Sequence, residues 1–207
     1  MANIYFHPDI DYQGIKDIEN KYTSIDKDYL INEASDYICK ILKKLVKKTD
    51  SILFICGPGH NGLDSLFTAY KLLRMKYNIS IFFTQKNIHL EYVKKYDLNN
   101  FIICTYDASD SYTYIIDGIF GYGLNRNLDK NSIDLIKSIN QSSSKVISLD
   151  VPSGLHHATG QSMPVSLRCD LLISLLTMKR GLFTNQGRDS WKEITFCKLI
   201  NTEITSK

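Results

Sequence analysis

The chain has 207 residues, of which 43% are apolar and 23% charged, and its formal net charge is +3. A chain of this size and composition is expected to form one globular domain over residues 1–207 that buries roughly 70% of its unfolded surface. The small net charge argues against a nucleic-acid-binding protein. The densest basic run, Lys40–Lys48, follows a helical pattern and is interpreted as its solvated face, with a basic groove for RNA as the alternative.

The five cysteines are far apart in the sequence and form no CxxC pair. This pattern argues against a disulfide framework or a zinc site and favours reduced thiols. The N-terminal residues have neither the charge pattern of a secretory signal nor that of a transit peptide. No segment has the roughly 18 apolar residues that a membrane span requires. We therefore expect a cytoplasmic protein with no membrane partner.

Helices are predicted at the start of the chain, over 13–22 and 29–45. The second is the clearer, because Leu30, Ala34 and Ile38 begin a stripe of apolar residues at helical spacing. Further along, short apolar runs alternate with helical patterns. Strands are expected over 51–56, 79–84, 101–105, 114–119, 146–149, 171–175 and 193–199, and helices around 66–73, 90–96 and 132–139.

Alternation of strands and helices is typical of a parallel sheet with helices on both faces. The predicted fold is therefore α/β: a three-layer Rossmann-like sandwich with a mainly parallel sheet, against which the two N-terminal helices pack. No internal repeat, low-complexity tract or second-domain boundary is evident in the sequence.

Three of the predicted strands run into segments that are rich in glycine, amide and carboxylate groups. These segments are 57–64, 117–126 and 150–155. In open parallel sheets, ligands bind in the crevice at the carboxyl ends of the strands. The sequence therefore predicts a small-molecule site at that edge of the sheet.

The first of these segments has two interpretations. Its backbone N–H groups could hold a phosphate at a helix N-terminus, or the segment could be a tight turn in which Asn61 or Asp64 caps the helix. The spacing of Gly57, Gly59 and Gly62 matches the dinucleotide pattern GxGxxG, although the following helix entry is unusual. No Gly-Lys-Ser/Thr follows, which excludes a Walker A loop.

Asp117 and Asp150 each lie at or near the exit of a predicted strand. Each could cap a neighbouring helix. Together with Asn61 and Ser153 they could instead hold a hard cation in an all-oxygen shell. Asp150, which leaves a buried strand, could also act as a general acid/base. Arg126 could pair with a phosphate or form a surface salt bridge.

Three segments of this chain form a pattern: Gly57-Pro-Gly-His-Asn-Gly-Leu-Asp64, Asp117-Gly-Ile-Phe-Gly-Tyr-Gly-Leu-Asn-Arg126 and Ser148-Leu-Asp-Val-Pro-Ser-Gly-Leu155. Together they resemble the motifs of the NAD(P)H-hydrate epimerases, the YjeF N-terminal domain. Their order and spacing agree with the family, and the resemblance extends from about residue 13 to residue 199.

The resemblance implies an isomerase of metabolite repair that interconverts the R and S forms of hydrated NADH or NADPH, so that a separate dehydratase can restore the cofactor. It implies a potassium ion held by Asn61, Asp117 and Ser153, and it places Asp150 at the reactive end of the substrate. A homodimer is also implied. Substrate contacts would come from Asp150 and from two loops: His60, Asn61, Gly62, Leu63 and Asp64, and Gly121, Tyr122, Gly123, Leu124, Asn125, Arg126 and Asn127.

The chain departs from the family pattern at His60, Leu63 and Tyr122, where asparagine, glycine and threonine are usual. The family also includes non-catalytic members, so the alternative function is a nucleotide- or RNA-binding scaffold of the same fold. We favour the enzyme, because a scaffold could have lost any of the polar residues that this chain retains: Asn61, Asp64, Asp117, Arg126, Asp150 and Ser153.

Overall fold

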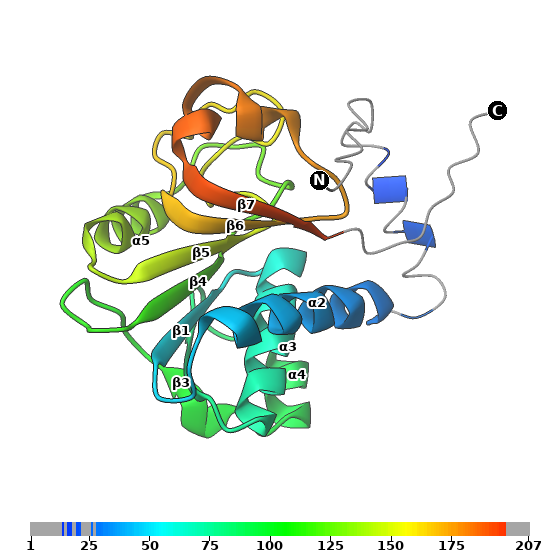
Figure 1. The fold of residues 1–207 in the computed structure, drawn as a ribbon, viewed down its shortest axis with the longest axis vertical. Helices are drawn as coiled ribbons and strands as arrows, with labels where there is room; N and C mark the ends of the chain where they lie inside the picture. The colour runs from blue at the N-terminus through cyan, green and yellow to red at the C-terminus, as the bar shows by residue number, and fades with distance from the viewer. Residues whose placement is uncertain (1–13, 15, 18–19, 22–25, 27, 198–207) are drawn as a thin grey trace.

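The computed structural model describes residues 14, 16–17, 20–21, 26 and 28–197. Its centre is a seven-stranded sheet with the order β3-β2-β1-β4-β5-β6-β7, and all neighbouring strands are parallel (Figure 1). This confirms the predicted α/β fold and its mainly parallel sheet. The strands are β1 (Ser51–Cys56), β2 (Asn78–Phe83), β3 (Ile102–Ile103), β4 (Tyr114–Gly118), β5 (Lys145–Leu149), β6 (Cys169–Leu175) and β7 (Trp191–Cys197).

The helices also follow the predicted order. They are α2 (Tyr29–Leu45), α3 (His60–Arg74), α4 (Leu90–Lys95) and α5 (Lys130–Gln141), with short 3₁₀ helices η1 (Asn99–Phe101), η2 (Arg180–Phe183) and η3 (Asn185–Asp189). The helix predicted over 13–22 lies largely outside the described residues. Those of its residues that are described, 14, 16–17 and 20–21, are helical.

The sheet separates two hydrophobic cores, because successive side chains of a strand point to opposite faces. On β1, Ile52 and Phe54 face the core that α2, α3 and α4 cover. Leu53 and Ile55 face the second core, which contains Ile136 of α5. All four β1 side chains are fully buried. A central parallel strand is covered on both faces, so its side chains are apolar throughout and do not alternate with polar ones.

Helix α2 spans the range that its apolar stripe predicts. Ile38 and Leu42 are fully buried within the core that also contains Leu66 of α3. The hydroxyl group of Tyr37 donates a hydrogen bond to the carbonyl oxygen of Phe196 at 2.8 Å, which ties α2 to β7. This helix therefore extends from the middle of the sheet towards the β7 edge (Figure 1).

The strand predicted over 101–105 is much shorter in the structure. Strand β3 contains only Ile102 and Ile103, which pair with Ile81 and Phe82 of β2, while residues 99–101 form η1. β3 lies at the edge of the sheet, so it has a partner on one side only. The apolar pattern over 101–105 predicts a strand, but it does not predict how many of its residues pair with β2.

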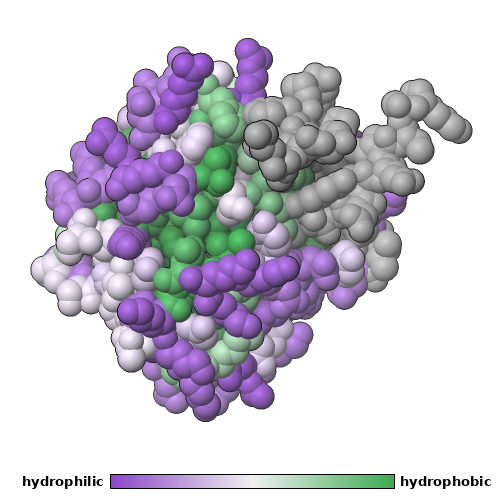
Figure 2. All heavy atoms as spheres, viewed as in Figure 1, coloured by the Kyte–Doolittle hydropathy of each residue, from purple (hydrophilic) through white to green (hydrophobic). Residues whose placement is uncertain are grey.

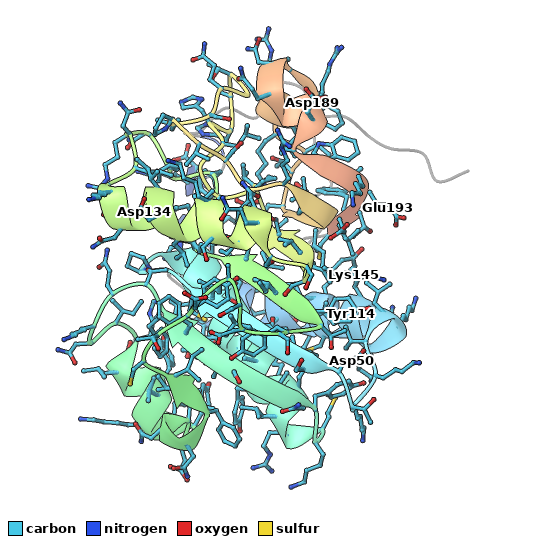
Figure 3. The ribbon with its side chains drawn as sticks, turned by 90° about the vertical axis from the view of Figure 1, so that its left-hand side faces the viewer. Asp50, Tyr114, Asp134, Lys145, Asp189 and Glu193 are labelled. Carbon is cyan, nitrogen blue, oxygen red and sulfur yellow. The ribbon has the colours of Figure 1, made fainter. Side chains whose placement is uncertain are left out.

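The amino ends and the carboxyl ends of the strands form two different sides of the sheet. Asp50, Tyr114 and Lys145 mark the edge where the strands begin (Figure 3), and the Lys145 ammonium lies 5.9 Å from the centre of the Tyr114 ring. At the other edge the chain order reverses between β1 and β4, which is the switch point where open α/β sheets bind ligands.

The surface of the molecule mixes apolar and hydrophilic areas. On the face drawn in Figure 2, apolar side chains gather in a central strip with hydrophilic residues beside it. None of the helices in the described part of the chain has the length and apolar character needed to cross a membrane.

Candidate active site

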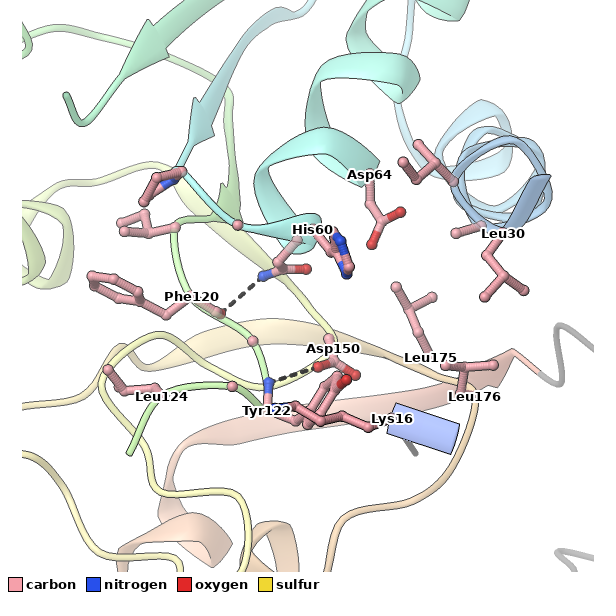
Figure 4. A pocket seen from close by; sticks show the side chains of 18 of the residues that line it. Lys16, Leu30, His60, Asp64, Phe120, Tyr122, Leu124, Asp150, Leu175 and Leu176 are labelled. Carbon is pink, nitrogen blue, oxygen red and sulfur yellow. Dashed lines mark hydrogen bonds between the residues drawn. The ribbon is translucent and has the colours of Figure 1, made fainter. Parts of the chain in front are cut away.

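A cavity of about 520 Å³ lies at the carboxyl ends of the central strands, where the sequence predicted a site (Figure 4). This volume is typical of small-molecule and cofactor sites. One wall is apolar and contains Leu30, Ile31, Ala34, Leu175 and Leu176. The remainder combines the start of α3 with the loops after β4 and β5, and it contains Pro58, Gly59, His60, Asn61, Asp64, Ile119, Phe120, Gly121, Tyr122, Gly123, Leu124, Asn125, Arg126 and Asp150, together with Lys16.

The glycine segment brings the start of α3 against the backbone of the neighbouring loops. A side chain at Gly62 would lie 1.8 Å from the carbonyl oxygen of Gly57, and one at Gly57 would lie 1.8 Å from that of Ile119. His89 reinforces this arrangement, because its Nε2 donates a hydrogen bond to the Gly57 oxygen at 2.8 Å. The loop after β1 is therefore fixed tightly against the loop after β4.

Asn61 links the loops that follow β4 and β5. Its side-chain Nδ2 donates hydrogen bonds to the carbonyl oxygens of Phe120 at 2.9 Å and Leu149 at 3.1 Å. The N-cap of α3 is Gly59 without a side-chain hydrogen bond, so the alternative that Asn61 or Asp64 caps this helix is wrong. The Oδ1 atom of Asn61 is buried and has no hydrogen-bond partner among the described residues.

Asp117, at the end of β4, is fully buried. Its carboxylate accepts hydrogen bonds from the backbone N–H of Ser153 at 3.0 Å, from the Ser153 hydroxyl at 2.5 Å and from the Ser148 hydroxyl at 2.8 Å. The backbone N–H of Ile119 donates a fourth at 3.2 Å. Burial raises the pKa of the Asp117 carboxyl group, and these hydrogen bonds oppose that rise. Asp117 therefore fixes the turn around Ser153.

Asp150 follows β5 directly and lines the cavity. Its φ of +66° lies in the left-handed region, where residues other than glycine are uncommon. One carboxylate oxygen accepts a hydrogen bond from the backbone N–H of Tyr122 at 2.9 Å. The other oxygen contacts the ammonium group of Lys179. The hydrogen bonds of the Asp150 carboxylate thus go to Tyr122 and Lys179, and the turn around Ser153 is held by Asp117 instead.

Lys179 is a residue of the site that sequence reasoning missed. It lies four residues after β6, and its side chain is only 2% exposed. Its ammonium group forms an ion pair with Asp150 and donates a hydrogen bond to the carbonyl oxygen of Leu175. Charged lysines are almost never fully buried unless they are paired. From the sequence, Lys179 is interpreted as a structural residue near the crevice, because a lysine before a Gly-Leu turn is usually structural.

Most of the predicted substrate-binding residues line the cavity, but three do not. Gly62 lies against the Gly57 backbone, Leu63 packs against the core on the α2–α3 side of the sheet, and Asn127 is exposed outside the cavity. Leu63 is helical, so leucine in place of glycine causes no backbone strain here. Arg126 lines the cavity and forms no ion pair with any described residue, which does not support the salt-bridge alternative.

The residues predicted to hold potassium form one connected network. The carbonyl oxygen of Phe120 contacts Asn61 at 2.9 Å and the Ser153 hydroxyl at 3.3 Å, and that hydroxyl contacts Asp117. The described residues contain no group of three or more His, Cys, Asp or Glu side chains suited to a metal. An ion here would need amide, hydroxyl and carbonyl oxygens as well. The unpartnered oxygen of Asn61 fits such an all-oxygen shell.

Residues 27–181 match the family model described as "YjeF-related protein N-terminus". The chain belongs to this family. Its relatives include a bifunctional NAD(P)H-hydrate repair enzyme Nnr from Dictyoglomus turgidum, which is 31% identical over 91% of this chain and 39% of that protein. An NAD(P)H-hydrate epimerase from Entamoeba histolytica is 31% identical over 68% of this chain and 65% of that protein.

A similar fold is also found among solved structures. The crystal structure of yeast ynu0 (YNL200c) matches with a TM-score of 0.63 and 21% sequence identity, over 82% of this chain and 75% of that chain. The cavity-lining motifs of the present YjeF-related chain lie inside the part that the family model covers, and so does Lys179.

Proposed function

We propose that this chain is an NAD(P)H-hydrate epimerase, which interconverts the R and S forms of hydrated NADH or NADPH. Two relatives named for hydrate repair support the proposal. The observation that carries it is the placement of Asp150, a carboxylate held on the wall of the 520 Å³ cavity by Tyr122 and Lys179.

Epimerisation requires a bond to the hydroxylated ring carbon to break and to form again on the opposite face. In the proposed route the hydroxyl group takes a proton from Asp150 and leaves as water, so the C–O bond breaks and a ring cation conjugated with the ring nitrogen remains. Water then adds to the other face and returns a proton to the Asp150 carboxylate. The configuration inverts and Asp150 regains its starting state. Such general acid/base catalysis is worth about 10²–10⁴-fold in rate.

The two walls of the cavity suggest how the substrate would lie. The apolar wall formed by Leu30, Ile31 and Leu175 would take flat, weakly polar parts of the dinucleotide. Arg126 lines the cavity and is exposed, so its guanidinium could pair with a phosphate group. His60 and the segment 121–125 would complete the contacts.

Potassium is proposed as the cofactor, held by Asn61, Asp117 and Ser153. The support is the unpartnered Asn61 oxygen in a network that includes the buried Asp117 carboxylate. When bound, the ion would supply positive charge that fixes the loops after β1, β4 and β5. The protein's own residues carry the proton transfers.

The functional partner, the location and the oligomeric state of the chain are also proposals. The bifunctional relatives support functional coupling to a dehydratase activity. A cytoplasmic location and a homodimer remain proposals. Light scattering at micromolar concentration tests the homodimer, and a monomer-sized particle would exclude it.

A coupled assay tests the proposed activity. Purified protein is mixed with both hydrate epimers and an excess of a dehydratase that accepts only the S form. The dehydratase consumes the S form directly. We expect it to consume the R form as well, at a rate proportional to the amount of this chain that is added. Binding of the hydrate without any acceleration of R-form consumption would instead support the scaffold alternative.

A further inference from the structure

Two neighbouring strands end in the same unusual turn at the cavity. After β5, the N–H of Val151 donates a hydrogen bond to the Leu149 carbonyl at 2.8 Å around Asp150, whose φ is +66°. After β6, the N–H of Thr177 donates to the Leu175 carbonyl at 2.7 Å around Leu176, whose φ is +60°. Turns of this three-residue kind with positive φ are rare and strained, and they persist only where surrounding contacts hold them.

Lys179 connects these two turns. Its ammonium group contacts the Leu175 carbonyl at the first residue of the β6 turn and the Asp150 carboxylate at the centre of the β5 turn. Its side chain is 2% exposed and that of Asp150 is 8% exposed. The other Asp150 oxygen is restrained by the N–H of Tyr122. Both oxygens of the carboxylate are therefore fixed from neighbouring loops.

Asp150 and Lys179 differ in their access to the substrate. Asp150 lines the cavity, whereas Lys179 lies behind it and forms no part of the cavity wall. Lys179 can therefore affect a bound substrate only through the residues that it holds, Asp150 and the Leu175 turn. This geometry distinguishes a residue that orients another from one that touches the reacting atoms.

We propose that Lys179 is a positioning residue of the epimerase: it orients the Asp150 carboxylate and stabilises its charge when the proton has moved to the leaving hydroxyl group. This inference rests on the proposed function. Asp150 that carries the proton contacts Lys179 only as a neutral group, whereas the ionised carboxylate forms the ion pair seen in the structure, so Lys179 favours the state after proton transfer. Interactions that strengthen during the reaction raise kcat rather than substrate affinity.

The first test compares Lys179→Met with the wild-type chain in the coupled assay. Methionine keeps the length of the side chain and removes the charge and the donors. We expect kcat to fall by roughly 100-fold, the scale of a misplaced catalytic group, while KM changes less than about two-fold. Lys192→Met is the matched control, because Lys192 forms an exposed pair with Asp170 at 2.6 Å and lies outside the cavity wall. That variant is expected to keep wild-type kcat.

The second test is a double-mutant comparison. If Lys179 acts only through Asp150, Asp150→Asn and Asp150→Asn/Lys179→Met will epimerise at rates within about two-fold of each other. The double variant removes both charges, so it leaves no unpaired carboxylate in the interior. Should Lys179→Met fail to fold, this comparison still decides the question.

The outcomes separate the inference from the proposed function. An active wild-type chain with unchanged kcat in Lys179→Met would overturn the inference alone. So would a double variant at least ten-fold slower than Asp150→Asn, because Lys179 would then act independently. A wild-type chain without epimerase activity would overturn the proposed function and this inference with it.

Discussion

Asp150 occupies a backbone conformation that few residues adopt, and it is restrained on both carboxylate oxygens. Such restraint suits a group that must meet one atom of a substrate in a fixed direction. Its exit from a buried strand allowed the sequence to predict its position, because polar groups at strand ends collect at one edge of a parallel sheet.

Asp150→Asn tests the acid/base role. Asparagine keeps the size of the side chain and an oxygen for the Tyr122 N–H, but it cannot exchange the proton. We expect the epimerisation rate to fall by about 10²–10⁴-fold and the thermal midpoint to fall as well, because the buried Lys179 ammonium loses its counter-ion. The matched control is Asp134→Asn, an exposed carboxylate on α5 (Figure 3). A wild-type rate in folded Asp150→Asn would exclude Asp150 as the acid/base.

Asp117 provides the test of the proposed ion. Potassium chloride is expected to raise the thermal midpoint above that in sodium chloride at equal ionic strength, because a ligand that binds only the folded state stabilises it. Asp117→Asn should lose this difference. Asp64→Asn should keep the difference between the two salts, since Asp64 lines the cavity but is not one of the proposed potassium ligands. An equal potassium effect in Asp117→Asn would contradict the assignment.

His89 gives a prediction about pH. Burial lowers the pKa of His89, so the folded chain binds fewer protons at this site than the unfolded chain. The contribution of His89 to the free energy of unfolding is therefore fully present above the ordinary histidine pKa of 6.5. This contribution is lost as the pH falls through the lowered pKa that His89 has in the folded chain. His89→Gln should flatten this loss of stability in denaturant titrations between neutral and mildly acidic pH. An unchanged slope would show that His89 does not contribute.

At the scale of elements, the contact between the β1–α3 turn and the β4 exit depends on small residues. Gly62→Ala would place a methyl group 1.8 Å from the Gly57 carbonyl oxygen, which is backbone and cannot turn aside. We expect a loss of about 1–3 kcal/mol in the free energy of unfolding, as for other overpacked sites.

Gly59→Ala is the matched control for that change. Gly59 is the N-cap of the same helix, with a φ of −90°, and a methyl group there would meet no atom within 4 Å. Its free energy of unfolding should lie much closer to that of the wild type. Because alanine has the higher helix propensity, equal losses in both variants would mean that the close approach to Gly57 does not decide the effect.

The elements also show how far sequence reasoning extends. The apolar stripe through Leu30, Ala34 and Ile38 predicted α2 because helix periodicity is a local property. The length of β3 depended on pairing with β2, which no local pattern records. The burial of Lys179 depended on the loop after β6 turning back to Leu175. Contacts between distant segments decided both cases.

For the whole molecule, the strand order brings the ends of β1, β4, β5 and β6 to one edge. Asn61, Asp117, Asp150 and Ser153 were predicted together because each follows or adjoins such an end, and Asn61 bridges 88 residues to reach Leu149. Membership of the YjeF-related family agrees with this arrangement. We propose that the cavity at this edge is an epimerase site.

The most direct measurement starts from one purified epimer of NADPH hydrate and follows the appearance of the other by chromatography. No second enzyme is needed. With the wild-type chain, the two forms are expected to reach equilibrium at a rate proportional to added protein and well above that in buffer alone. Interconversion no faster than in protein-free buffer, from a folded chain with potassium present, would contradict the claim.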